Sequence, residues 1–275
     1  NTIEPLYDMF ELADPLTNMF AQSWNKLMGT CSGGETVEGI DYHHISSVSV
    51  GPHDNILVAS RELSTVWSLW HNGSGVQWQL SSQLSPTSRT IRFADDAGEF
   101  FSPHDVKQMA NGNLLVIDDG ASRPGCYELI TANCFSRAVM YEIDEAASTA
   151  SVLWQFAYPF DVGTSTWSDA MADDVYNACG GSVDKLANGN YLVAFTGMSN
   201  KGEQGDDYAE VTRTALAWEI DADAGFPGED DARVHGPQVR SALKIPIPHS
   251  NVGLQNGYRL VPWSNIAGES TDEPW

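Results

Sequence analysis

The sequence has few basic residues for its length. Among its 275 residues, Lys and Arg number 14 and Asp and Glu number 37, which gives a formal net charge of −23 at pH 7. Because so acidic a surface repels phosphate groups, we expect neither nucleic acid nor an anionic membrane surface as a partner. The sequence also lacks a run of about 18 apolar residues, so no transmembrane span is predicted. A hydrophobic fraction of 42% still allows the chain to bury a core.

Cysteine is scarce as well, and its spacing is informative. Cys31, Cys126, Cys134 and Cys179 include no CxxC pair, which argues against a zinc site or a thioredoxin-type motif. An even number of cysteines fits two disulfides in an oxidising compartment. We therefore predict a secreted protein, extracellular or periplasmic, in which Cys126 pairs with Cys134 and Cys31 with Cys179.

Two parts of the chain differ in texture. Residues 1–35 have helix-like apolar spacing that is broken by Pro15, and we predict a short N-terminal helical extension there. In residues 36–275, short segments rich in Val, Ile, Leu, Trp and Tyr alternate with Gly, Asn, Asp and Ser turns. This alternation is typical of an all-β domain with many short strands.

The β-rich part contains internal repeats. Residues 104–116 recur without a gap 77 positions later, at 181–193, and residues 138–144 recur at the same offset. Looser copies lie at 44–58 and 251–261. Each unit reads as two strands joined by a turn, then an aromatic strand, and in places a Trp-Gln strand. The Asn-Gly pair in the turn predicts a type I′ hairpin, in which both central residues have positive φ.

Repeated four-stranded units favour a β-propeller, because each unit then forms one blade of a ring. About four hairpin units are clear in the sequence, and the intervening segments are long enough to hide further strands. The alternative is a β-sandwich, which would not need copies of one hairpin. A smaller or incomplete ring is a further alternative.

Several strings between residues 40 and 265 occur in the order found in a known family. They are His44–Val48, Pro103–Asp105, Asn111–Gly120, Ser136–Asp144 and Gly257–Trp263. In these strings the chain resembles the arylsulfotransferase (ASST-type) propellers. The resemblance implies a six-bladed propeller that transfers a sulfuryl group, without PAPS, from a phenolic sulfate ester to a phenol. It also implies that a histidine on the propeller axis carries the sulfuryl group as a covalent intermediate.

The same resemblance suggests site residues. His44 and His104 match two of the family's central histidines, Arg123 matches its site arginine, and Arg137 is a weaker substitute for that arginine. In the third unit, where the resemblance places the accepting histidine, the chain has Gly181 and no histidine nearby. Either the nucleophile is lost, or His44 or His104 replaces it, or the chain is a non-catalytic relative.

The repeat register supports one location for the two histidines. His104 stands nine residues before Asn113, in the position of Gly181, and His44 stands eleven residues before Asn55. Because equivalent positions in successive blades surround one axis, we expect the two imidazoles to converge at the central channel. A neutral imidazole can act as nucleophile or base, and an arginine can bind sulfate oxygens.

Other residues are weaker candidates. Four tryptophans at repeated strand positions are predicted to form the core between blades, namely Trp67, Trp78, Trp154 and Trp218. Trp167 and Trp263 fall outside that pattern and are candidates to line a substrate pocket. Asp221 and Asp223 form a weak calcium candidate, since the full EF-hand spacing fails. No other cofactor is expected.

Three classes of function remain open from the sequence. The first is an arylsulfotransferase-like enzyme acting on a small phenolic or sulfated substrate. The second is a non-catalytic, acidic extracellular propeller that binds a protein or polysaccharide partner. The third is a carbohydrate-active propeller such as a polysaccharide lyase, which would pair His104 with Tyr127 or Tyr176.

Overall fold

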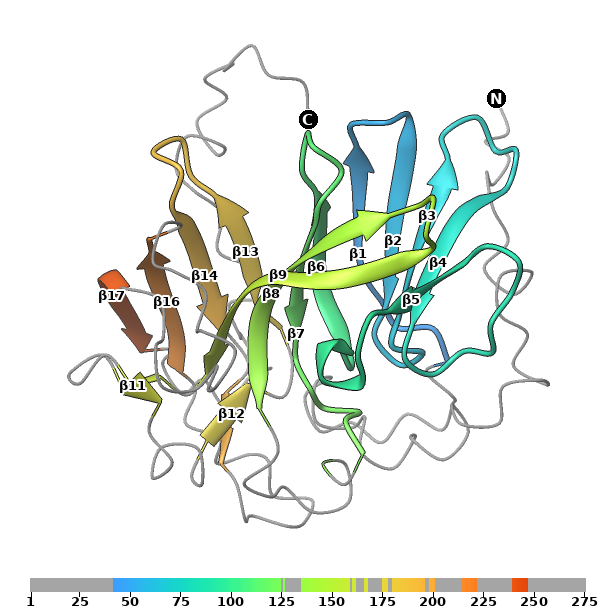
Figure 1. Cartoon of the computed structure of the whole chain (residues 1–275). Coiled ribbons are helices and arrows are strands. Elements are labelled where there is room, and N and C mark those ends of the chain that lie inside the picture. The colour runs from blue at the N-terminus through green and yellow to red at the C-terminus, as the bar shows by residue number, and fades with distance from the viewer. Residues whose placement is uncertain are drawn as a thin grey trace, which may run out of the picture.

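In a computed structural model of the chain, the described residues form β-strands joined by turns and one short 3₁₀ helix, η3 (Asp96–Gly98) (Figure 1). The described residues are 42–124, 126, 135–158, 160–161, 166–167, 175–177, 180–195, 198–200, 214–221 and 239–246. The predicted helical extension over residues 1–35 lies outside them.

Three antiparallel sheets of four strands make up most of the described structure. Blade 1 contains β1 (Ile45–Gly51), β2 (Asn55–Ser60), β3 (Thr65–Trp70) and β4 (Val76–Ser81). Blade 2 contains β6 (Pro103–Gln108), β7 (Leu114–Asp118), β8 (Ser136–Asp144) and β9 (Thr149–Tyr158). Blade 3 contains β13 (Ser182–Lys185), β14 (Tyr191–Phe195), β16 (Thr214–Ile220) and β17 (Val239–Pro246).

Short strands connect or flank the blades. The strand β5 (Thr90–Phe93) runs parallel to β4 on one side and to β9 on the other, and so joins blades 1 and 2 into one nine-stranded sheet. The other short strands are β10 (Phe160–Asp161), β11 (Thr166–Trp167), β12 (Val175–Asn177) and β15 (Met198–Asn200). All five lie in the long segments between the clear hairpin units of the sequence.

The first strands of the three blades lie side by side. The Ser49 hydroxyl on β1 donates to the Val106 carbonyl on β6 at 2.8 Å. The Lys107 ammonium on β6 donates to the Val183 carbonyl on β13 at 2.7 Å and to the Asp184 carboxylate at 2.6 Å. Successive four-stranded meanders that meet through their first strands have the architecture of a β-propeller, and the described strands do not form a two-layer sandwich. The propeller fold is thus confirmed, and the total number of blades stays a prediction.

The core lies between the blades. Along β7, Leu114 and Val116 pack in the cluster shared with blade 1, whereas Leu115 and Ile117 pack in the cluster shared with blade 3. This alternation follows from the strand geometry, in which successive side chains point to opposite faces. The four predicted core tryptophans are confirmed as buried, with exposed fractions of 1–4%, but only three of them pack in the clusters between blades, since Trp67 packs in a cluster formed by blade 1 and its flanking residues. Burying each such side chain contributes about 2 kcal/mol to stability.

The hairpin turns correct one expectation. In the turn of blade 2, Gly112 has φ +90° and its N–H donates to the Met109 carbonyl, while Asn111 is not in the positive-φ region. The turn at Gly189 in blade 3 has the same geometry. The Asn-Gly pair therefore does not form a type I′ turn; the loop has three residues, and its last residue is left-handed. In blade 1 the same place is taken by Asp54, with φ +55°.

Candidate functional site

The candidate site is built where blades 1 and 2 meet, near the start of β6. His104 is the second residue of β6 and lies in a bulge that interrupts the pairing with β7 between Pro103 and Val106. A bulge redirects a side chain away from the regular alternation of the strand. The His104 side chain is buried, with the residue only 2% exposed. The central side chain of the candidate site is therefore an imidazole enclosed by protein atoms.

The surroundings of His104 keep its imidazole neutral. Burial above all, with smaller electrostatic contributions from Arg61 and His44, lowers the pKa of His104 to about 3. At neutral pH the imidazole is therefore in the uncharged form, in which one ring nitrogen carries the lone pair that a nucleophile or base requires. The influence of His44 on this pKa also shows that the two histidines lie within electrostatic reach of each other.

His44 occupies a different backbone position from the one expected. It directly precedes β1, has φ +42°, and its carbonyl accepts the Arg61 N–H at 3.0 Å. Ile45 pairs with Ser60 at the end of β2, and Pro103 pairs with the residue that ends β7, Asp118. Ile45 and Pro103 are therefore equivalent, and the counterpart of His44 is Ser102. The expectation that His44 and His104 are equivalent is wrong, because the counterpart of His104 is Ser46.

Arg61 is a buried basic residue whose charge lowers the pKa of His104, and no sequence motif pointed to it. It begins the turn between β2 and β3, is 5% exposed, and its backbone is tied to His44. Its Nη1 lies 2.5 Å from Glu62 Oε1, and its Nε lies 3.8 Å from Asp119 Oδ2. A buried guanidinium needs such carboxylates, since an unpaired buried charge is strongly destabilising. The available sequence signal was its place one residue after β2, which corresponds to Asp119 one residue after β7.

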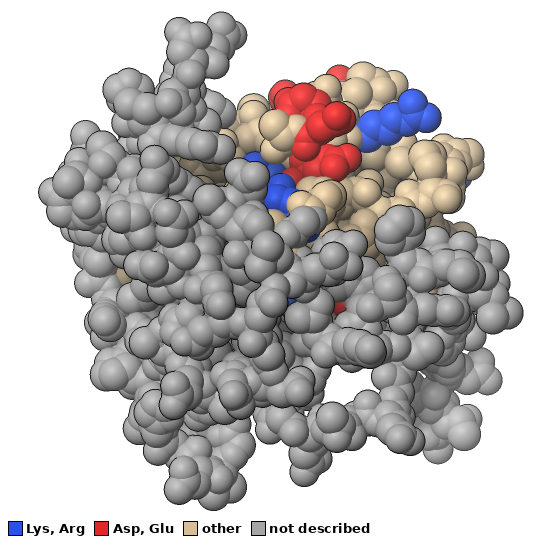
Figure 2. Space-filling view, turned by 90° about the horizontal axis from the view of Figure 1, so that it is seen from below, with Lys and Arg blue, Asp and Glu red and all other residues tan. Residues whose placement is uncertain are grey.

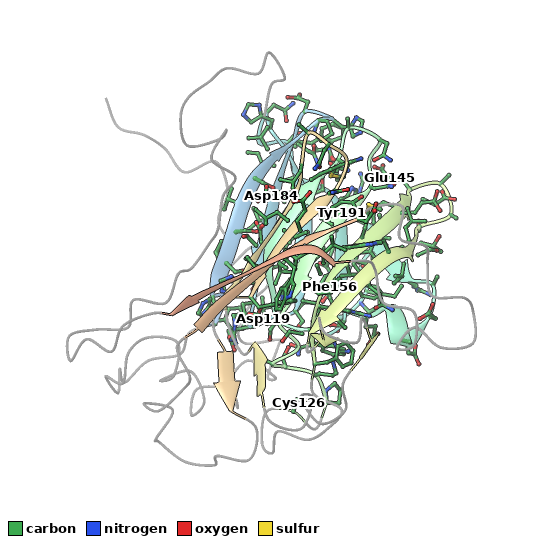
Figure 3. All side chains as sticks on the ribbon, turned by 90° about the vertical axis from the view of Figure 1, so that its left-hand side faces the viewer. Asp119, Cys126, Glu145, Phe156, Asp184 and Tyr191 are labelled. Atoms are coloured by element: carbon green, nitrogen blue, oxygen red, sulfur yellow. The ribbon has the colours of Figure 1, made fainter. Side chains whose placement is uncertain are left out.

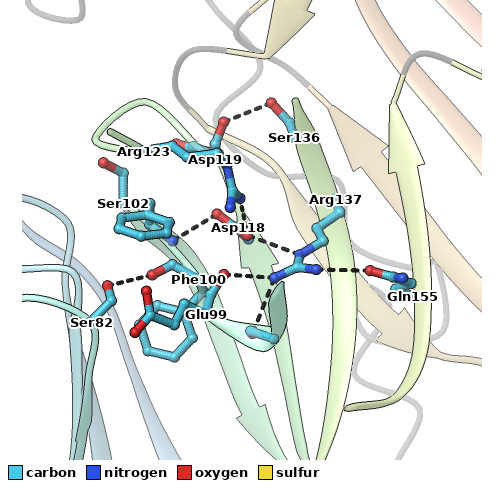
Figure 4. A network of polar contacts seen from close by, with 12 residues as sticks. Ser82, Glu99, Phe100, Ser102, Asp118, Asp119, Arg123, Ser136, Arg137 and Gln155 are labelled. Atoms are coloured by element: carbon cyan, nitrogen blue, oxygen red, sulfur yellow. Dashed lines mark hydrogen bonds and ion pairs between the residues drawn. The ribbon is translucent and has the colours of Figure 1, made fainter. Parts of the chain in front are cut away.

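Arg123 and Arg137, the two arginines that the sequence suggested, both bind Asp118 (Figure 4). Arg123 Nη2 lies 2.8 Å and Arg137 Nε lies 3.0 Å from Asp118 Oδ2. The other carboxylate oxygen, Oδ1, accepts the Phe101 N–H at 2.9 Å. Burial lowers the pKa of Arg123, and the nearby charge of Asp118 opposes that effect.

The remaining contacts of these arginines hold loops in place. Arg137 donates to the carbonyls of Ala97, Gly98 and Glu99, and to Gln155 Oε1. The Arg123 guanidinium carbon lies 4.0 Å from the centre of the Phe135 ring, a cation–π contact. The structure therefore brings together His44, His104 and Arg61, and places Arg123 and Arg137 in a neighbouring scaffold around Asp118.

The charged groups of the site are not part of the exposed charge. On the face seen in Figure 2, acidic side chains form a patch with basic side chains at its margins. Arg61, Glu62 and Asp119 are at most 5% exposed. Asp119 lies toward the end of the molecule where Cys126 lies, and Glu145 lies toward the opposite end (Figure 3). The site thus lies near one end of the blades, where the first strands begin.

Comparison with known proteins identifies the family. The sequence pattern of the arylsulfotransferase (ASST) family matches residues 3–224. The chain belongs to the arylsulfotransferase family. The match begins within the segment expected to form a separate extension, whose helical structure stays a prediction. No curated protein matches the sequence.

Solved structures resemble this arylsulfotransferase-family chain only distantly. The WD40 beta propeller domain of Doa1 is 12% identical, with a TM-score of 0.28, over 62% of this chain and 39% of that one. KlHsv2, with loop 6CD replaced by a Gly-Ser linker, is 8% identical, with a TM-score of 0.30, over 76% and 46%. A protein of unknown function from Bacteroides caccae is 13% identical, with a TM-score of 0.28, over 72% and 60%. The matched regions thus span less than two thirds of each of these chains.

The third blade of this arylsulfotransferase-family chain has no histidine at the repeated position, and its backbone accounts for that. Gly181 has φ +128°, and a Cβ added there would lie 2.7 Å from the Ala194 carbonyl oxygen. A histidine at this position would be strained and would clash with the backbone of β14. The tight approach of β13 and β14 therefore requires glycine here.

The other predicted residues are only partly placed. Trp167 forms part of β11, with its side chain outside the described residues, and Trp263 and Asp223 lie outside them altogether. Asp221 directly follows β16, and the described residues contain no group of three metal-ligating side chains. Cys126 is buried, and the other three cysteines lie outside the described residues. The substrate pocket, the calcium site and the disulfide pairing stay predictions.

Among the residues that the structure describes, no helix has the length and apolar character needed to cross a membrane.

Proposed function

We propose that the chain transfers a sulfuryl group from a phenolic sulfate ester to a phenol, without PAPS, and that His104 carries the group between them. The observation that carries this proposal is the neutral, buried imidazole of His104 within electrostatic reach of the Arg61 guanidinium. Membership of the arylsulfotransferase family supports the reaction class.

The first half of the reaction forms a covalent intermediate. A ring nitrogen of His104 uses its electron pair to attack the sulfur of the donor ester, and the bond between sulfur and the aryl oxygen breaks. The aryl oxygen leaves with the bonding electrons as a phenolate, which takes up a proton. Because the pKa of His104 is about 3, the electron pair is available across the neutral pH range.

The second half returns the enzyme to its starting state. The acceptor phenol loses its proton to a base, and its oxygen attacks the sulfur while the nitrogen–sulfur bond breaks. We assign the base role to His44, which precedes β1 and lies in electrostatic reach of His104. The electron pair then returns to the His104 ring nitrogen, and His44 releases the proton it received to the solvent, which supplied the proton taken up by the leaving phenolate.

Arg61 supplies the charge that the transition state requires. Negative charge spreads over the three sulfuryl oxygens during transfer, and a fixed guanidinium stabilises that charge. The carboxylates of Glu62 and Asp119 hold Arg61 in a buried place, so little reorganisation is needed during reaction. We keep Arg123 and Arg137 as residues that shape the neighbouring loops through Asp118, and Trp167 and Trp263 as proposed pocket residues.

A non-catalytic binding propeller is the second candidate function. The absence of a histidine at Gly181, where the resemblance suggested the accepting residue, favours it. In that case the acidic surface would bind an extracellular protein or polysaccharide. We further propose a secreted location, extracellular or periplasmic, on the basis of the net charge and the even number of cysteines.

The test uses 4-nitrophenyl sulfate as donor and a simple phenol as acceptor. We expect the wild type to release nitrophenol, and expect His104→Ala and Arg61→Lys to reduce kcat by at least about a hundredfold. His53→Ala is the matched control, because His53 is an exposed histidine in the turn between β1 and β2. Absence of release by the wild type across pH and salt would favour the binding propeller. Full activity in His104→Ala would show that the transfer uses another residue.

A further inference from the structure

Three buried serines connect the two segments that carry the site residues. Ser64 lies three residues after Arg61, and Ser102 lies two residues before His104. Ser122 lies three residues after Asp119, and strand pairing makes it the counterpart of Ser64. Their exposed fractions are 0%, 1% and 4%. Their hydroxyls bond to one another, so we expect any role they have in the reaction to be exerted through their neighbours.

The hydrogen bonds among the three serines form a closed network. The Ser102 N–H donates to Ser64 Oγ at 3.0 Å, and Ser64 Oγ lies 2.7 Å from Ser122 Oγ. The Ser102 hydroxyl donates to Ser122 Oγ at 2.8 Å, and the Ser122 N–H donates to Ser102 Oγ at 3.1 Å. The network therefore joins a turn of blade 1 to the loop before β6 and to the loop after β7.

Two of these serines have unusual backbone conformations. Ser64 has φ +44° and Ser102 has φ +56°, and His44 nearby has φ +42°. Residues other than glycine adopt the left-handed region at a cost and keep it only where surrounding contacts enforce it. Such strain gathers at sites where geometry matters for function. Here it coincides with the hydroxyl network and with the two segments that carry Arg61 and His104.

We infer that the Ser64–Ser102–Ser122 cluster is a positioning element that sets the place of His104 relative to Arg61. This inference rests on the proposed sulfuryl transfer. In that reaction the imidazole and the guanidinium must contact the same sulfuryl group, so the backbones that carry them must keep a fixed separation. A displacement of about 1 Å can reduce a rate by about a hundredfold. Within the cluster, the Ser102 N–H bonds directly to Ser64 Oγ, and Ser122 bonds to both serines, so the cluster links the segment of Arg61 to the segment of His104.

The variants are chosen to remove the network with little other change. Ser102→Gly removes the hydroxyl but tolerates positive φ, and Ser122→Ala removes the hydroxyl that bonds to both partners. Ser122→Thr keeps a hydroxyl. Ser68→Ala is the matched control, because Ser68 is fully buried on β3 and makes two hydrogen bonds of 2.8 Å, to Asn55 and Gln77.

The first measurement is steady-state transfer from 4-nitrophenyl sulfate to phenol. We expect Ser102→Gly and Ser122→Ala to lower kcat by about tenfold to a hundredfold, with KM for the donor changed by less than about threefold. Ser122→Thr should recover part of kcat, and Ser68→Ala should keep kcat within about twofold while losing comparable thermal stability. If the cluster only stabilised the fold, kcat would fall in every variant, Ser68→Ala included, in proportion to the loss of melting temperature.

The second measurement does not depend on activity. Histidine-labelled protein is titrated by NMR, and the His104 signal reports its protonation in the field of Arg61, Glu62, Asp119 and His44. We expect His104 to stay neutral at pH 5 in the wild type and in Ser68→Ala, and to protonate at higher pH in Ser102→Gly and Ser122→Ala.

The two measurements separate failure of the inference from failure of the proposed function. If the wild type transfers sulfuryl groups but both cluster variants keep kcat within about twofold, the positioning role is wrong and the function stands. If the wild type is inactive, the proposed function fails and the titration decides alone. An unchanged His104 titration in the cluster variants then overturns the positioning role, and a raised pKa supports it.

Discussion

The three described blades meet at two places, which we call the first corner (blades 1 and 2) and the second corner (blades 2 and 3). Both derive from the same hairpin pattern, but they contain different residues. The first corner holds His104, Arg61 and the serine cluster, with left-handed backbone at residues that carry side chains. The second holds Gly180 and Gly181, both with positive φ and with close backbone contact at Gly181. At the first corner a bulge carries the His104 side chain, whereas at the second the backbone leaves no space for a side chain at Gly181.

Ion pairs between β6 and β13 hold the second corner together. Lys107 Nζ lies 2.9 Å from Asp105 and 2.6 Å from Asp184, and Asp105 also accepts the Val183 N–H at 3.1 Å. These contacts fasten β6 to β13. The strand that presents His104 toward blade 1 is therefore anchored on its other side to blade 3. The first corner thus carries the proposed catalytic residues, whereas the second serves to hold blades 2 and 3 together.

The largest expected effect is at Arg61. Arg61→Met should lower the free energy of unfolding by about 3–5 kcal/mol, because Glu62 and Asp119 would be left as buried charges without their partner. Urea denaturation at neutral pH measures the loss. Arg89→Met is the control, since Arg89 is exposed. A loss no larger than that of the control would show that the corner does not depend on the guanidinium.

Acid should weaken the same corner through His104. The folded-state pKa of about 3 lies below the ordinary value of 6.5, so between these values the unfolded chain binds more protons than the folded one. Stability from this group is complete above pH 6.5 and should fall by about 3 kcal/mol on acidification to about pH 4. Unfolding curves of wild type and His104→Gln measure the difference, and equal pH slopes in the two proteins would contradict the buried neutral imidazole.

At the second corner, Gly181→Ala should destabilise the protein by about 2 kcal/mol. The new Cβ would lie 2.7 Å from the Ala194 carbonyl oxygen, and φ +128° is unfavourable for alanine. Gly189→Ala is the matched control, because Gly189 has φ +90° but no atom within 4 Å of an added Cβ. Thermal melting of both variants separates the clash from the backbone cost. Equal melting temperatures would mean that β13 and β14 can move apart.

The smallest effect on stability is expected at Lys107, whose ion pairs join β6 to β13. Lys107→Met should cost about 1 kcal/mol, because the lysine is partly exposed, Asp105 keeps the Val183 N–H as a donor, and the Asp184 side chain keeps partial access to solvent. Chemical denaturation at low and high salt measures it, and high salt should reduce the difference from wild type. A loss as large as that of Arg61→Met would erase the contrast between the two corners.

Much of the fold followed from local patterns. The strands β7 and β14 begin at the same place in the two gapless copies of the repeat, because each apolar run follows an Asn-Gly-Asn turn. The burial of Trp78 and Trp154 followed from their repeated place in the fourth strand of a unit. The turn type was wrong because an Asn-Gly pair suits more than one hairpin loop, and the loop length decides between them.

The candidate site was harder to predict because its residues come from different blades. His104 and His44 were found through motif resemblance, but their relative register depends on bulges that no local pattern reveals. Arg61 was missed because a single arginine after a strand is ordinarily exposed. Arg123 and Arg137 had the right residue type, yet both are bound to Asp118.

The sequence by itself determined the all-β class, the repeating hairpins, the apolar alternation that packs blade on blade, and the strongly acidic charge. These are properties of neighbouring residues and of composition, which hold wherever the blades finally lie. Only the tertiary structure decided that burial lowers the pKa of His104, that the charge of Arg61 adds to this effect, and that three serines link the segments that carry the two residues. Burial and electrostatic shifts depend on what surrounds a group in space, and here the surroundings come from turns far apart in the chain.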